Sequence, residues 1–152
     1  MRILFLIPAR GGSKGLPNKN SKLLKDKPLI LHTTDLLKEK FVGHDIQICV
    51  SSDSESIIQL VENSGINVPF VRPAAYAQDD SSSESVMLHA LHFYQEKGIN
   101  FELLVLLQPT SPLKSRKQIE EAISQFTPEM DMVVSVKKSK SNPYFNLDRK
   151  ST

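Results

Sequence analysis

The stretch Ile3–Asn20 reads ILFLIPARGGSKGLPNKN, an uninterrupted apolar run followed by a loop of glycine, lysine and asparagine. Such an apolar run is typical of a strand buried on both faces, as in a parallel sheet covered by helices. Glycines let a loop turn tightly and approach a ligand closely, and the N–H groups of such a turn can surround phosphate oxygens. The stretch therefore predicts a buried first strand that leads into an anion-binding loop.

The rest of the chain alternates apolar runs with helix-type segments. After the first strand we expect strands at 46–50, 68–71, 103–107 and 132–136, separated by helices at 28–40, 54–64, 81–97 and 115–126. Two of the helix starts have the spacing of a capping box, Ser81 with Glu84 and Ser115 with Gln118. This order predicts an α/β fold with a three-layer, doubly wound, mostly parallel sheet of the Rossmann-like type.

Charge and cysteine content narrow the classes of function. The 152 residues are enough for one domain, and a net charge of +2 does not indicate a nucleic-acid or membrane binder. Positive charge is concentrated between Arg10 and Lys27, with six basic residues against Asp26 alone, which predicts a local anion site. The single cysteine, Cys49, cannot form an internal disulfide, and we find neither a leader peptide nor a bilayer-spanning apolar run. We therefore expect a cytoplasmic protein.

The glycine-rich loop matches neither of two common phosphate-binding motifs. In the Walker loop a glycine precedes lysine, but Gly15 precedes Leu16, and the spacing Gly-x-Gly-x-x-Gly is absent because Ser13 stands two positions after Gly11. Positive charge in a strand–loop–helix setting nevertheless favours phosphate binding over an ordinary glycine turn. The candidate ligand groups are the cations Arg10, Lys14 and Lys19 and the neutral Ser13 and Asn20.

Residues 7–20, IPARGGSKGLPNKN, resemble the signature of the acylneuraminate cytidylyltransferases, the CMP-sialic acid synthetase family that includes the legionaminic and pseudaminic acid cytidylyltransferases. Further matches follow in order: VSSD at 50–53, VRPA at 71–74, LLQPTSP at 106–112 and VVSV at 133–136. The resemblance implies a nucleotide-diphospho-sugar transferase fold. It also implies transfer of CMP from CTP to the anomeric hydroxyl of a nine-carbon 2-keto sugar acid, with release of pyrophosphate. A Kdo or other sugar nucleotidyltransferase and a non-catalytic nucleotide-binding fragment remain open.

The resemblance assigns roles to individual residues. Lys19 and Arg10 are the expected catalytic groups, and Gln108 is expected to contact the sugar acid. The expected nucleotide-binding residues are Ala9, Arg10, Gly11, Ser13, Lys14, Asn20, Arg72 and Ser83. Ser83 could equally serve only in helix capping.

The resemblance also concerns the extent of the protein. The resemblance implies Mg²⁺ as the cofactor. In the family its acidic ligands lie in the later part of the chain, and we find no equivalent stretch before Thr152. Residues 1–152 are accordingly interpreted as the nucleotide-binding α/β domain at the N-terminal part of a longer cytidylyltransferase. The full-length form is expected to be a homodimer that binds CTP and a sialic-acid-like sugar acid, with neither nucleic acid nor membrane as a partner.

Three further side chains have competing interpretations. Asp53 follows the second predicted strand, where it could contact a metal or ribose, but we favour capping of the next helix. His89 and His92 lie three apart on a predicted helix, yet a zinc site is disfavoured because no third ligand is evident nearby.

Overall fold

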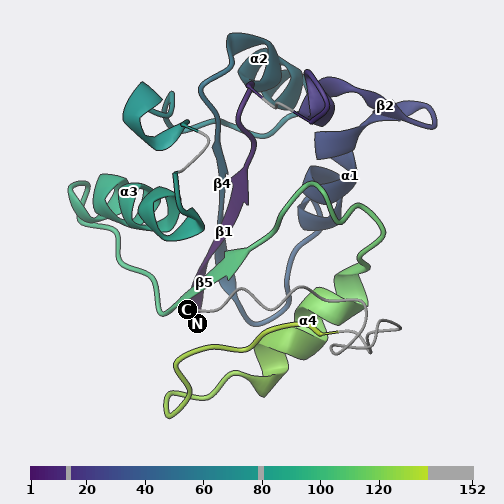
Figure 1. The fold of residues 1–152 in the computed structure, drawn as a ribbon. Helices are drawn as coiled ribbons and strands as arrows, with labels where there is room; N and C mark the ends of the chain where they lie inside the picture. The colour runs from purple at the N-terminus through teal and green to yellow at the C-terminus, as the bar shows by residue number, and fades with distance from the viewer. Residues whose placement is uncertain (13–14, 79–80, 137–152) are drawn as a thin grey trace, which may run out of the picture. The chain divides into compact units, whose positions relative to one another are not determined.

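The structure is a computed structural model that describes residues 1–12, 15–78 and 81–136 (Figure 1). The chain divides into two compact units, Met1–Arg116 and Lys117–Thr152. The elements of the first unit are β1 (Arg2–Pro8), η1 (Lys19–Ser21), β2 (Leu23–Leu24), β3 (Lys27–Pro28), α1 (Leu29–Thr34), η2 (Asp35–Leu37), β4 (Asp45–Ser51), α2 (Glu55–Asn63), η3 (Ala74–Tyr76), α3 (Ser83–Gln95) and β5 (Leu103–Leu106). Helix α4 (Arg116–Gln125) begins at the last residue of the first unit and continues into the second.

The main sheet is parallel, with β1 at its centre. Its strand order is β4-β1-β5, and Leu6 of β1 is in register with Cys49 of β4 and Leu106 of β5. Val71 adds a parallel bridge to Ser52, just past the end of β4. The chain thus moves outward from β1 through β4 and then returns to the opposite side of β1 at β5. The predicted doubly wound α/β fold is confirmed.

Helical segments cover both faces of this sheet, and α3 and α1 lie on opposite sides of it in Figure 1. Leu4 and Leu6 pack with Tyr94 and other residues of α3, in a cluster that also contains Cys49. Alternate residues of β1 face the other way, where the ring centroid of Phe5 lies 4.9 Å from that of Phe41. All five residues 3–7 are fully buried. Burial of each such side chain contributes about 2 kcal/mol to stability.

Two predicted strands do not form as expected. The segment 68–71 contributes only the Val71 bridge, and 132–136 forms no strand in the described part of the chain. The side chains of Met132 and Val136 are instead exposed, at 72% and 88%. An apolar run becomes a strand only where a neighbouring strand takes up its hydrogen bonds, and 132–136 has no such neighbour among the residues that the structure describes.

Two helix boundaries also differ from the prediction. The helix expected at 28–40 is the short α1 followed by the 3₁₀ turn Asp35–Leu37. The predicted capping box of Ser81 with Glu84 is wrong, because the N-cap of α3 is Ser82, one residue later than predicted. The Ser82 hydroxyl accepts the Ser85 N–H at 3.1 Å. Each of three successive serines can cap a helix, so composition alone does not fix the first residue.

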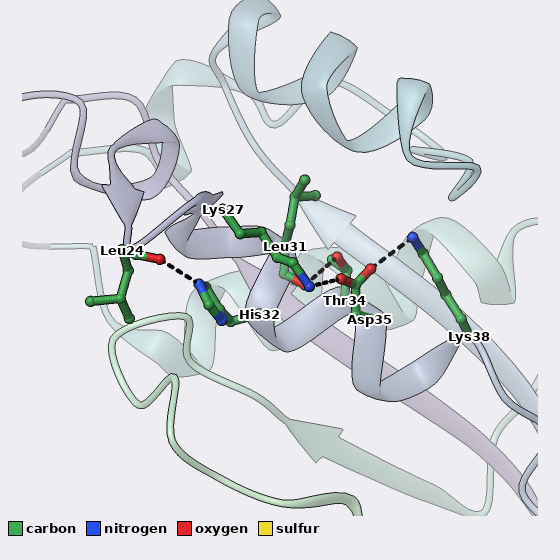
Figure 2. Close-up of polar contacts among 7 residues, drawn as sticks. All are labelled: Leu24, Lys27, Leu31, His32, Thr34, Asp35 and Lys38. Carbon is green, nitrogen blue, oxygen red and sulfur yellow. Dashed lines mark hydrogen bonds and ion pairs between the residues drawn. The ribbon is translucent and has the colours of Figure 1, made fainter.

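The β2–β3 hairpin connects the N-terminal loop to α1, and polar contacts hold the two together (Figure 2). Lys27 Nζ lies 2.5 Å from Asp35 Oδ2, Lys38 Nζ lies 2.7 Å from Asp35 Oδ1, and His32 Nε2 lies 3.1 Å from Leu24 O. Burial acts to raise the pKa of Asp35, but hydrogen bonds from the two lysines outweigh it and lower that pKa. The Lys27 charge is thus engaged by Asp35. No helix of the described residues is both long and apolar enough to cross a membrane.

Candidate functional site

A pocket of about 290 Å³ lies at the carboxyl ends of β1 and β5. β4 and β5 lie on opposite sides of β1, so the order of the strands reverses at β1 and the loops that follow the strands diverge there. Doubly wound sheets bind ligands at such a reversal point. The pocket belongs entirely to the first unit. Its lining residues are Pro8, Arg10, Lys19, Asn20, Arg72, Tyr76, Gln78, Ser81, Ser82, Ser83, Val86, Gln108, Pro109 and Thr110.

Most of the residues predicted for the site come together here. Those that line the pocket are Arg10, Lys19, Asn20, Arg72, Ser83 and Gln108. Ala9 and Gly11 do not line it and instead anchor the loop through their backbone. Ser13 and Lys14 lie outside the described residues.

The N-terminal loop is held mainly through backbone groups. The Ala9 N–H donates to Ser51 O at 2.9 Å, which continues the pairing of β1 with β4 beyond the end of the strands. Asn20 Nδ2 donates to Arg10 O at 3.0 Å, and the Asn20 side chain is buried. Asn20 therefore fixes the backbone of Arg10 from the far end of the loop, so that Arg10 and Lys19 open onto one pocket.

Gly11 is required by the close approach of the loop to the start of α2. A Cβ atom on Gly11 would lie 2.8 Å from Ser54 Cβ, closer than real Cβ atoms come. The Gly11 N–H donates to Asp53 Oδ1 at 2.9 Å. The expected capping of α2 by Asp53 is wrong, since Ser54 occupies the N-cap position and the Asp53 carboxylate holds the loop. Sequence could not distinguish these roles, because the partner of Asp53 lies far away in the chain.

Arg72 forms a buried part of the pocket wall and is only 4% exposed. Its Nε donates to Ser51 Oγ at 2.9 Å, its Nη2 donates to Ser51 O, and its Nη1 donates to Tyr76 O at 3.4 Å. The Arg72 N–H donates to Ser52 O at 2.7 Å. Burial lowers the pKa of Arg72, and the charge of Asp53 acts in the opposite direction. The hydrogen bonds of this guanidinium therefore connect the end of β4 to the segment around Tyr76.

The wall from Tyr76 to Ser83 is backed by aromatic packing. The Tyr76 ring lies 4.8 Å from the ring of His89, which makes an edge contact with Phe70 at 4.7 Å. Burial lowers the pKa of His89, and the charge of Arg72 adds to that effect. His89 thus packs between the rings of Tyr76 and Phe70. Ser83 is the first residue of α3 and lines the pocket beside the N-cap Ser82.

The loop after β5 is held by a lysine that sequence analysis did not single out. Lys114 Nζ donates to Gln108 O at 2.8 Å, to Ser111 O at 2.7 Å and to Thr33 Oγ1 at 3.1 Å. Burial lowers the pKa of Lys114 to about 8. Ser51 was also missed, although its VSSD motif was matched, because its contacts are made to Arg72 and Ala9 across the fold.

The described residues contain no cluster of three metal-ligating side chains. Nowhere in 1–12, 15–78 and 81–136 do three His, Cys, Asp or Glu side chains gather so that they could hold a metal ion. The acid beside the loop, Asp53, has one carboxylate oxygen bonded to the Gly11 N–H. Because proteins often hold Mg²⁺ through one or two carboxylates together with substrate phosphates, the expected Mg²⁺ stays a prediction.

Comparison with known proteins agrees with this geometry. The family model described as Cytidylyltransferase matches residues 4–149, which is nearly the whole chain. The chain belongs to the cytidylyltransferase family. It is 38% identical to the CMP-N,N'-diacetyllegionaminic acid synthase of Legionella pneumophila, over 90% of this chain and 58% of that protein. It is 39% identical to an N-acylneuraminate cytidylyltransferase of Escherichia coli, over 91% of this chain and 32% of that protein.

A solved structure of another protein shares the fold. A CMP:2-keto-3-deoxy-manno-octonic acid synthetase complexed with CTP superposes with a TM-score of 0.65 and 22% identity, over 82% of this chain and 46% of that one. The chain thus spans about half of that structure, and between one third and three fifths of the two curated family members.

Proposed function

We propose that the pocket binds CTP and that the chain forms the nucleotide half of an enzyme that transfers CMP to the anomeric hydroxyl of a nine-carbon 2-keto sugar acid. The observation that carries the proposal is the convergence of Arg10 and Lys19 with Gln108 at the reversal point of the sheet. The similarity to proteins named for legionaminic and N-acylneuraminic acids supports this acceptor class.

The proposed chemistry requires positioning and charge neutralisation. The sugar hydroxyl attacks the α-phosphorus and loses its proton to solvent, a new P–O bond forms, and the bond to the departing pyrophosphate breaks. Arg10 and Lys19 offset the negative charge of the phosphates, while Ser83 and the start of α3 face the nucleoside. Gln108, on the wall formed by the loop after β5, orients the sugar acid. The Mg²⁺ cofactor and the homodimer of the full-length form remain predictions.

Nucleotide selectivity tests the proposal directly. CTP should raise the melting temperature of the protein strongly, whereas UTP, GTP and ATP should change it little, because only a ligand that binds the folded state stabilises it. Lys19→Ala should weaken CTP binding about tenfold, the loss of roughly one charge-assisted hydrogen bond. The matched control is Lys22→Ala, which removes an exposed lysine of the same loop outside the pocket. Unchanged CTP affinity in Lys19→Ala would overturn the assignment of the loop.

Acceptor choice separates the competing functions. Pyrophosphate release from CTP should depend on a nine-carbon acid such as N-acetylneuraminic acid. Faster release with Kdo would instead identify a Kdo enzyme. CTP binding without pyrophosphate release for any acceptor would favour a non-catalytic nucleotide-binding fragment.

A further inference from the structure

The loop after β5 forms one wall of the pocket, and its shape depends on more than its own residues. Gln108, Pro109 and Thr110 line the pocket, and the Ser111 N–H donates to Gln108 O at 3.2 Å. Proline at 109 and 112 restricts the backbone but supplies no N–H donor. Further hydrogen bonds to the carbonyl groups of this loop come from outside it.

Lys114 donates these hydrogen bonds. Its ammonium group has three N–H bonds, and the structure provides three acceptors: Gln108 O, Ser111 O and Thr33 Oγ1. Two acceptors belong to the loop and the third belongs to α1. A half-buried ammonium is tolerated when its donors are satisfied. With a pKa of about 8, Lys114 is mostly protonated at neutral pH and can donate all three hydrogen bonds.

This contact joins two parts of the pocket that are distant in sequence. Thr33 is fully buried within α1, so its hydroxyl is a fixed point. The start of α1 is in turn held by the hydrogen bond from the Leu29 N–H to Lys22 O at 2.8 Å, next to the 3₁₀ turn that carries Lys19. A continuous path of contacts therefore runs from the Gln108 wall through Lys114 and α1 to the loop of the catalytic candidates.

We propose that Lys114 is a positioning residue that fixes the Gln108–Thr110 wall of the pocket against α1 and thereby sets the place of the sugar acid relative to the nucleotide. The placement of the wall rests on geometry alone. The effect on the sugar acid rests on the proposed function.

Amide hydrogen exchange in the free chain tests the placement of the wall. In Lys114→Met the amides of Thr110 and Ser111 should exchange at least fivefold faster, because the carbonyls of their loop lose two donors. Lys114→Arg, which keeps the charge and the donors, should restore most of the protection. Lys117→Met is the matched control, since Lys117 is an 84% exposed lysine three positions away, and it should leave these amides unchanged.

A second variant guards against misfolding of Lys114→Met. Thr33→Val keeps the volume of the buried side chain and removes only the hydroxyl that Lys114 uses. It should speed exchange of the same two amides by a smaller factor. Wild-type exchange rates in both Lys114→Met and Thr33→Val would overturn the proposal.

Steady-state kinetics then test the effect on substrates. In the full-length enzyme Lys114→Met should raise KM for N-acetylneuraminic acid about tenfold while KM for CTP changes less than twofold, and Lys114→Arg should recover most of the loss. An equal rise in both KM values would indicate general loosening and overturn the role in sugar placement. A wild-type chain that neither binds CTP nor releases pyrophosphate would refute the proposed function. The exchange measurement would still show whether Lys114 fixes the Gln108–Thr110 wall.

Discussion

The two sides of the pocket are built in opposite ways. On the N-terminal side the loop from Ala9 to Asn20 is held mainly through backbone contacts, and its cation Lys19 is partly exposed in the pocket. On the other side Arg72 is almost completely buried, and its guanidinium bonds Ser51 and Tyr76. The cations that line one pocket therefore differ in their surroundings: Lys19 is partly exposed and is proposed to contact the phosphates, whereas the buried Arg72 joins parts of the wall.

The largest expected effect comes from Arg72. Arg72→Met should lower the free energy of unfolding by about 3 kcal/mol, because the buried Ser51 Oγ loses its donor, Ser51 O loses one of its two donors, and the part-buried Tyr76 O loses the Arg72 Nη1 bond. Urea denaturation measures this change. Lys19→Met should shift the same quantity by less than about 0.5 kcal/mol, as exposed substitutions do. If Arg72→Met left stability intact and abolished only CTP binding, the contrast between the two sides would be wrong.

Gly11 tests how tightly the N-terminal side is built. Gly11→Ala should cost about 1–2 kcal/mol, because the added methyl group meets Ser54 Cβ at 2.8 Å. Adding Ser54→Gly should recover most of this loss, and thermal unfolding of the two variants gives the comparison. Gly12→Ala is the control, since a Cβ at Gly12 meets nothing within 4 Å. Equal destabilisation by both alanine variants would contradict a local clash.

The smallest expected effect is at Asp53. Asp53→Ala should cost about 1 kcal/mol and speed exchange of the Gly11 amide, because that N–H loses its charged acceptor. Asp53→Asn should lose less, since an amide oxygen still accepts the bond. Hydrogen exchange at Gly11 follows both variants. A slower rate in either one would show that the carboxylate does not hold this amide.

Sequence predicted the parts of the fold that depend on local pattern. The run Ile3–Ile7 is apolar at every position, which is sufficient to predict a doubly covered central strand. The segment 132–136 is also mostly apolar, with Ser135 as its one polar residue, but a strand needs a neighbouring strand as well. A single run of sequence does not show which strand it will pair with.

The candidate site likewise has residues that a local pattern predicts and residues whose roles depend on contacts across the fold. Arg10 and Lys19 could be predicted because glycine and positive charge occur together in one short stretch. The capping residue of α3, the buried contacts of Arg72 and the role of Lys114 could not, since each depends on which side chains the fold brings together. Asp53 was misassigned for that reason: its position favoured a cap, and its partner Gly11 lies across the fold.

The central position of β1 has a consequence for biosynthesis. Strand β1 is synthesised before both of its partners, β4 on one side and β5 on the other, so the pairing of Ile3 with Leu103 forms only after about 100 further residues. At typical elongation rates of about 5–20 residues per second this delay lasts about 5–20 s. Both edges of the apolar strand are open until β4 is synthesised, and one edge stays open until β5 is. The nascent chain is therefore most vulnerable to aggregation before Leu106 emerges, and chaperone binding in that interval should concentrate on β1.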